Sequence, residues 1–170
     1  MALAGCLGPG AHTVAPTLGN GSATVGLWHT AGGDGCFWAR RDAVGNTIAN
    51  DIGDGPRYAE VLPGDAYFET DGCQPWVQGD GPYDPKYGLT PAGQLPGDGQ
   101  WRVNAEIPPG TYTASQPLDC YWARLNSFRG TDDINGPNTI IDNDFSGAVT
   151  IQASDVGFES ARCGTWTKVG

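Results

Sequence analysis

The stretch that decides the fold is Cys120-Tyr121-Trp122-Ala123-Arg124, because the chain contains it twice. Its earlier counterpart is Cys36-Phe37-Trp38-Ala39-Arg40, and in each copy a glycine, Gly26 or Gly110, stands ten residues before the cysteine. Both copies then continue with an acid, a phenylalanine, a second cysteine and a tryptophan: Asp65, Phe68, Cys73 and Trp76 in the first, and Asp155, Phe158, Cys163 and Trp166 in the second. Matches at so many fixed offsets indicate a tandem duplication.

The duplication sets the expected domain organisation. The match extends back to Gly8 and Gly97, so the copies are predicted at residues 8–78 and 97–170, after an N-terminal arm at residues 1–7. Between them, residues 79–96 contain four prolines and four glycines. Such a segment has too many breakers for a sheet interior, and it predicts a semi-extended linker.

The cysteines are predicted to staple each copy. At about 70 residues a hydrophobic core alone is marginal, and covalent cross-links are common. Cys36 with Cys73, and Cys120 with Cys163, hold equivalent places in the two copies, which favours one disulfide within each. Each would stabilise its module by roughly 4 kcal/mol in the chain-entropy model and would indicate a location outside a reducing cytosol. The alternative is four buried free thiols.

Composition predicts an all-β fold. The 27 glycines and 13 prolines interrupt every window that is long enough for an amphipathic helix. The remaining runs are short and alternating or β-branched, at residues 23–29, 57–62, 100–106, 110–114, 139–141, 148–152 and 165–169. Short strands between turn signals are typical of sandwiches and barrels, so we predict two tandem antiparallel β-sandwich or barrel modules.

The shared tryptophans and arginines are expected to be structural. Trp38 and Trp122 lie two residues after a cysteine, so they share its strand face and are predicted to fill a thin core beside the disulfide. The alternative is an exposed platform for sugar rings. Arg40 and Arg124 lie two residues further on the same face and are predicted to pair with an acid of their own module, such as Asp65 or Asp155.

Charge and motifs argue against several function classes. The net charge of −10, with nine scattered basic residues, argues against nucleic acid as a partner and against an anionic bilayer. Two histidines, His12 and His29, both lie in the first copy, and the chain carries no recognisable catalytic or phosphate-binding motif. We therefore predict no enzymatic activity, no catalytic residues and no cofactor.

One segment resembles the opening of a calcium loop. Residues 142–147, Asp-Asn-Asp-Phe-Ser-Gly, offer oxygen side chains at positions one, three and five and glycine at six. Ala153 stands where the bidentate glutamate belongs, so a plain Asx-rich turn is the favoured interpretation and no metal site is predicted.

The second copy carries a family resemblance. Its Cys120–Leu125 stretch, Ile141-Asp142-Asn143, Gly147, Val156–Ser160 and Cys163-Gly164-Thr165-Trp166 resemble a small domain found in secreted and lipid-anchored proteins of actinobacteria and in virion proteins of their phages. The first copy is a divergent match, with Cys73-Gln74-Pro75-Trp76 in place of C-G-x-W. The resemblance implies an extracytoplasmic, non-enzymatic β module and carries over no catalytic or ligand-binding residue.

The N-terminus favours two different roles. Leu3-Ala4-Gly5-Cys6 resembles a lipobox, which would make Cys6 a lipid attachment site, although too few residues precede it for the apolar region of a signal peptide. The first hypothesis is therefore an actinobacteriophage structural protein at the virion surface, either a capsid decoration or a minor tail protein. Its partners would be capsid or tail subunits, with host cell-surface polysaccharide as a further partner. The alternative is an extracytoplasmic, secreted or lipid-anchored cell-surface binding module, which meets a membrane only if Cys6 is lipidated.

Overall fold

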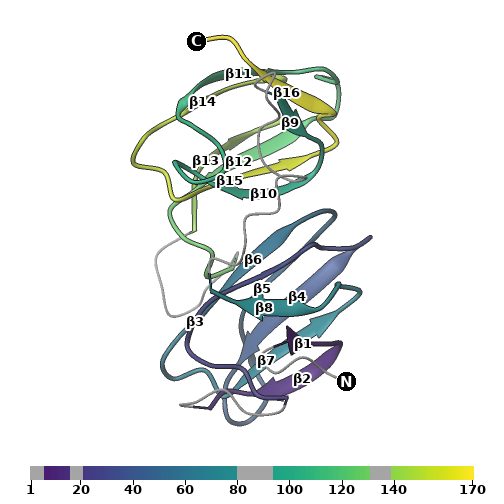
Figure 1. The fold of residues 1–170 in the computed structure, drawn as a ribbon, viewed down its shortest axis with the longest axis vertical. Coiled ribbons are helices and arrows are strands. Elements are labelled where there is room, and N and C mark those ends of the chain that lie inside the picture. Colours follow the sequence, from purple (N-terminus) through teal and green to yellow (C-terminus); the bar gives the residue numbers. More distant parts are fainter. Residues whose placement is uncertain (1–5, 16–20, 80–93, 131–138) are drawn as a thin grey trace. The chain divides into compact units, whose positions relative to one another are not determined.

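The structure is a computed structural model that describes residues 6–15, 21–79, 94–130 and 139–170 (Figure 1). The described residues form 16 strands and no helix, and they divide into two compact units. We call the unit that contains β1 to β8 module 1 and the unit that contains β9 to β16 module 2. None of the described residues forms a helix long and apolar enough to span a membrane.

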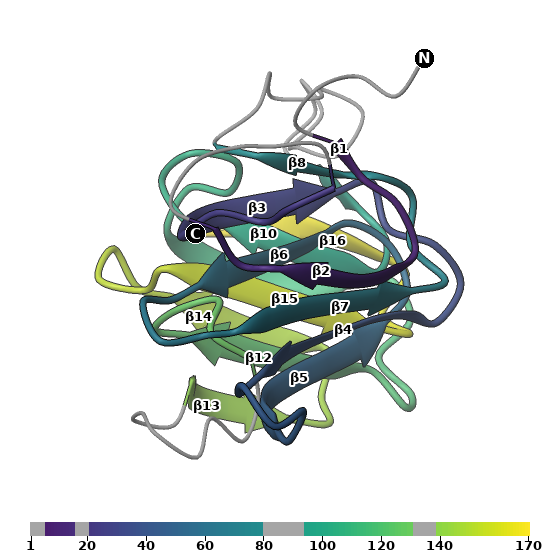
Figure 2. The ribbon, with the colours of Figure 1, turned by 90° about the horizontal axis from the view of Figure 1, so that it is seen from below.

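Module 1 consists of two four-stranded antiparallel sheets, with strand orders β1-β8-β3-β6 and β2-β7-β4-β5. Figure 2 shows β2, β7, β4 and β5 side by side. The strands are β1 (Cys6–Leu7), β2 (Gly10–Thr13), β3 (Gly26–Thr30), β4 (Cys36–Arg41), β5 (Thr47–Gly53), β6 (Arg57–Val61), β7 (Tyr67–Asp71) and β8 (Trp76–Gln78).

Module 2 repeats this topology strand for strand. Its sheets have the orders β9-β16-β11-β14 and β10-β15-β12-β13, so β9 to β16 take the places of β1 to β8. The strands are β9 (Gln94–Pro96), β10 (Gly99–Arg102), β11 (Gly110–Ala114), β12 (Tyr121–Leu125), β13 (Ile140–Asp144), β14 (Ala148–Ile151), β15 (Gly157–Ala161) and β16 (Thr165–Lys168). The predicted all-β, duplicated architecture is confirmed, with a sandwich in each module.

The cores repeat in their aromatic geometry. Phe68 meets Trp76 edge-on with ring centroids 5.3 Å apart, and Phe158 meets Trp166 in the same way at 5.5 Å. The indole of Trp76 donates to the Thr70 hydroxyl at 2.7 Å, as that of Trp166 does to Ser160 at 2.8 Å. The buried indole N–H groups of Trp76 and Trp166 thus each have a hydrogen-bond acceptor, as buried polar groups usually do.

Three boundaries of the predicted organisation need correction. The arm at residues 1–7 includes strand β1, which pairs with β8, and the linker at residues 79–96 includes strand β9, which pairs with β16. Both are short edge strands, where even Pro96 is tolerated because an edge residue needs no ladder hydrogen bond on its outer side. Of the described residues inside the predicted second copy, Phe128–Gly130 and Thr139 belong to module 1. The rest of the linker, residues 80–93, lies outside the described residues.

Candidate functional site

The structure forms the two disulfides that the duplication predicts, Cys36–Cys73 and Cys120–Cys163. In module 1 the bond joins the first residue of β4 to the turn that connects β7 with β8. The second disulfide closes the equivalent link before β16. Cys36, Cys120 and Cys163 are fully buried within the apolar clusters of their modules, so each bond ties one sheet to the start of the other through the core.

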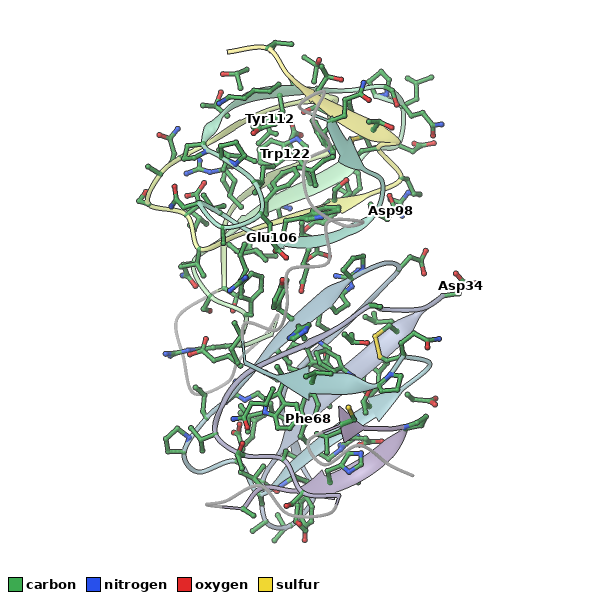
Figure 3. All side chains as sticks on the ribbon, in the orientation of Figure 1. Asp34, Phe68, Asp98, Glu106, Tyr112 and Trp122 are labelled. Atoms are coloured by element: carbon green, nitrogen blue, oxygen red, sulfur yellow. A yellow bond between two sulfur atoms is a disulfide. The ribbon has the colours of Figure 1, made fainter. Side chains whose placement is uncertain are left out.

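The tryptophans of the repeated stretch are core residues. Trp38 is 1% exposed and Trp122 is 6% exposed, and Trp122 lies between the two sheets of module 2 together with Tyr112 (Figure 3). The sugar-platform alternative for these two residues is therefore wrong, because neither indole presents a face to solvent.

The predicted arginine pairs are present in both modules. Arg40 binds Asp65 through two hydrogen bonds, at 2.7 and 3.1 Å, with both side chains 2% exposed. Arg124 binds Asp155 in the same two-pronged way, at 2.7 and 2.9 Å. Each aspartate also accepts a backbone N–H, from Leu62 in module 1 and from Gln152 in module 2. The hydrogen bonds and charge of Asp155 raise the pKa of the Arg124 guanidinium.

A β-bulge follows each of these arginines. The pairing register shifts between Arg40 and Arg41 in module 1 and between Arg124 and Leu125 in module 2. A bulge re-aims the side chains of its strand and bends it. Both modules therefore have the same arrangement of an arginine, its aspartate and a β-bulge. It lies at the edge of the core beside β5 in module 1 and beside β13 in module 2.

Module 1 contains one further part, which the sequence places between the cysteines of the second copy. We call residues Phe128–Gly130 the clasp. Phe128 is 4% exposed, its ring lies 4.8 Å from that of Tyr58 on β6, and its carbonyl accepts the Glu60 N–H at 2.8 Å. The Arg129 carbonyl accepts a hydrogen bond from Arg40 at 2.9 Å. The clasp therefore covers the open edge between β5 and β6 and completes the surroundings of the buried Arg40.

The positions of module 2 that correspond to the clasp-binding residues have different chemistry. The strand registers align Tyr58 with Ala148 and Ala49 with Asp142. Asp142 lies 3.5 Å from Arg124 and thus takes the place that a clasp carbonyl takes beside Arg40. Module 2 thus has no aromatic ring at the position of Tyr58 and no apolar side chain at the position of Ala49, and the clasp packs on module 1.

Gly130 provides a direct test of the clasp. Its φ is 96°, and a Cβ there would lie 2.9 Å from the Asn50 carbonyl oxygen and 2.9 Å from Cη2 of Trp38. Gly130→Ala is expected to destabilise module 1 by about 1–3 kcal/mol, through left-handed strain and displacement of the clasp. Gly45→Ala is the matched control, because Gly45 has a φ of 89° but an added Cβ would meet nothing within 4 Å. Equal losses in urea titrations of the two variants would contradict close packing of the clasp.

Tyr112 makes module 2 sensitive to alkali. Burial raises the pKa of its phenol to about 12, and its hydroxyl donates to the Pro108 carbonyl at 2.6 Å. The unfolded chain loses this proton near its ordinary pKa of about 10. The contribution to stability is thus complete below pH 10 and falls between pH 10 and about 12, at up to about 1.4 kcal/mol per pH unit.

The measurement compares urea unfolding of the natural chain and of Tyr112→Phe at several pH values between 8 and 12. Subtracting the two curves cancels the titration of every other group. The difference is expected to shrink as the pH rises, because phenylalanine has no proton to lose. A constant difference would contradict the raised pKa.

The segment that resembles a calcium loop in sequence does not form such a loop in the structure. Residues Ile140–Asp144 form strand β13, so Asp142 and Asn143 point to opposite sides of the sheet. Among the described residues, no three or more histidine, cysteine, aspartate or glutamate side chains group as metal ligands do. Cys6 is free and half-buried at the start of β1, opposite Val77.

The sequence interpretation gave no role to the outward residues of the repeated stretch. In both copies an aromatic residue and an alanine alternate with the tryptophan and the arginine, so Phe37, Ala39, Tyr121 and Ala123 lie on the opposite side of their strand. The two aromatic residues there are half-buried, and both alanines are 0% exposed. Their recurrence at equal offsets was visible in the sequence, and it shows that both modules repeat this side of the strand as well as the core side.

These features define the class: two tandem β-sandwiches, each with an internal disulfide, of the kind found outside the cytoplasm. Residues 8–77 and 93–167 each match the Rv1352-like extracellular domain, and the chain belongs to this family. The two matched segments confirm the duplication and an extracytoplasmic location. The chain matches no curated protein and no solved structure.

Proposed function

We propose that this protein is a non-enzymatic attachment module, secreted by the cell that makes it or anchored to that cell's surface. The observation that supports the proposal is the membership of both halves in a family of extracellular domains. Sandwiches that each contain a disulfide suit this role, because disulfides persist in an oxidising environment and stabilise small domains there.

The test is an antibody raised against the purified chain and applied to intact and lysed cells of the native host. The antibody is expected to label intact cells, or to detect the protein in the medium, while a cytoplasmic marker stays inaccessible. Labelling that requires lysis would overturn the proposal. Recovery of the protein at a fixed copy number in purified phage particles would overturn it in favour of a virion component.

The proposal includes two modes of attachment that Cys6 distinguishes. Cys6 opens β1, at the edge of a sheet of module 1, so a lipid on its sulfur would tether that sandwich by its first strand. Intact mass of the native protein separates the modes: a chain that begins at Cys6 and carries acyl groups is anchored, and an unmodified thiol indicates a secreted form. The virion role, as a capsid decoration or minor tail protein, stays an untested prediction, since the family match carries no link to phage particles.

A further inference from the structure

The chain passes between the two modules at three places. The first crossing lies within residues 79–96, and the other two lie in the connection between β12 and β13, at Ser127–Phe128 and Thr139–Ile140. A cut within residues 79–96 therefore leaves the clasp joined to module 2 by the continuous chain on both sides. It leaves the clasp joined to module 1 by non-covalent contacts alone.

Neither disulfide bridges such a cut. Cys36–Cys73 closes a loop that lies entirely before it, and Cys120–Cys163 closes a loop that lies entirely after it. Cys6, the fifth cysteine, is free. A chain that is cut there is thus two separate polypeptides, and only non-covalent contacts can keep them together.

Module 1 receives the clasp through one buried ring and two hydrogen bonds to clasp carbonyls. The Phe128 side chain is 4% exposed and packs on Tyr58, which is 5% exposed. The Phe128 carbonyl accepts the Glu60 N–H, and the Arg129 carbonyl accepts a hydrogen bond from the Arg40 guanidinium. A buried aromatic anchor with hydrogen-bonded neighbours is typical of the residues that dominate the affinity of protein interfaces.

The clasp is held in shape at both of its ends. Leu125, the last residue of β12, pairs with Ile140, the first residue of β13, so the two ends of the connection that contains the clasp lie side by side. Within that connection the Thr139 hydroxyl donates to the Gly130 carbonyl at 2.8 Å. A connection closed in this way has lost part of its conformational freedom before it meets module 1, which lowers the entropic cost of docking.

We infer that the clasp is a docking element, which keeps module 2 bound to module 1 independently of residues 79–96. Its binding site is the edge of module 1 between β5 and β6. There Gly130 lies so close to Trp38 and Asn50 that an added Cβ would be 2.9 Å from an atom of each. Module 2 lacks the equivalents of Tyr58 and Ala49, so this edge of module 1 is the partner that the clasp fits.

The inference goes beyond the proposed attachment function and does not depend on it. Outside the cytoplasm, proteolysis between the modules would release module 2 if residues 79–96 were its only connection to module 1. A docked clasp retains module 2 after such a cut, so the two halves continue to act as one protein.

The test uses the full chain with a recognition site for a site-specific protease inserted after Lys86. After complete cleavage, size-exclusion chromatography with light scattering is expected to show one species with the mass of the whole chain. Denaturing gels without reductant are expected to show two fragments. Phe128→Ala is expected to raise the Kd between the fragments, measured by dilution of the cut protein, at least about tenfold, as truncation of an interface anchor does.

The matched control is Phe145→Ala, the same truncation in the same fragment at a side chain that is 66% exposed. Its Kd is expected to equal that of the natural sequence. Circular dichroism of the uncut variants separates weakened docking from unfolding, and Gly130→Ala is a second variant that is expected to raise the Kd.

Fragments of the natural sequence that elute separately would overturn the inference without recourse to any variant. A Kd that neither Phe128→Ala nor Gly130→Ala raises would also overturn it, because a surface other than the clasp would then hold the fragments together.

Discussion

Asp65→Ala is expected to destabilise module 1 by about 3–5 kcal/mol, because it removes the carboxylate that pairs with the Arg40 guanidinium, and that guanidinium is only 2% exposed. The variant also removes the acceptor of the Leu62 N–H. Two hydrogen bonds from one guanidinium to one carboxylate give the pair its fixed geometry, and the variant loses both of them. The free energy of unfolding from urea titrations measures the effect.

The duplication supplies the control. Asp155→Ala removes the equivalent carboxylate in module 2, but Arg124 is 16% exposed and has Asp142 at 3.5 Å. Solvent and the second acid compensate part of the charge, so this loss is expected to be smaller. A larger loss for Asp155→Ala than for Asp65→Ala would contradict our account of burial at the two arginines.

Removing one disulfide is expected to lower the stability of its own module by roughly 4 kcal/mol. The loops closed by Cys36–Cys73 and Cys120–Cys163 span sequence separations of 37 and 43 residues, so the two effects are expected to be nearly equal. The reason is that cross-linking reduces the freedom of the unfolded chain, and this reduction depends only weakly on loop length.

The paired variants are Cys36→Ala/Cys73→Ala and Cys120→Ala/Cys163→Ala, each studied by hydrogen exchange with mass spectrometry. Faster exchange is expected in the strands of the altered module alone, apart from the clasp, which responds with module 1. Faster exchange throughout both modules after a single change would contradict two separately stapled units.

The sequence predicted those parts of the fold that depend on residue type at fixed spacing. Each copy repeats its tryptophan and arginine at equal offsets from the first cysteine and its aspartate at an equal offset from the second, and each of these residues has one dominant physical use in a thin β core. Because the two copies share these residues, comparing one copy with the other identifies them.

Other parts could not be predicted because their signal is not local. Strand β1 (Cys6–Leu7) is too short to show alternation, and β13 (Ile140–Asp144) has the polar composition of a turn but pairs with β12 as an edge strand. The clasp depends on Phe128 meeting Tyr58, which lies far earlier in the chain and in the other copy. No spacing rule connects these two residues, so their contact is visible only in the folded chain.

The most direct test of two extracytoplasmic sandwiches, each closed by its own bond, is the thiol state of the protein in its native setting. Cells and medium are treated with an alkylating reagent before lysis, and the protein is digested without reduction and analysed by mass spectrometry. We predict linked peptides that join Cys36 to Cys73 and Cys120 to Cys163, with no peptide that joins the two modules. Alkylation of all four of these cysteines, or a linkage between modules, would contradict the account.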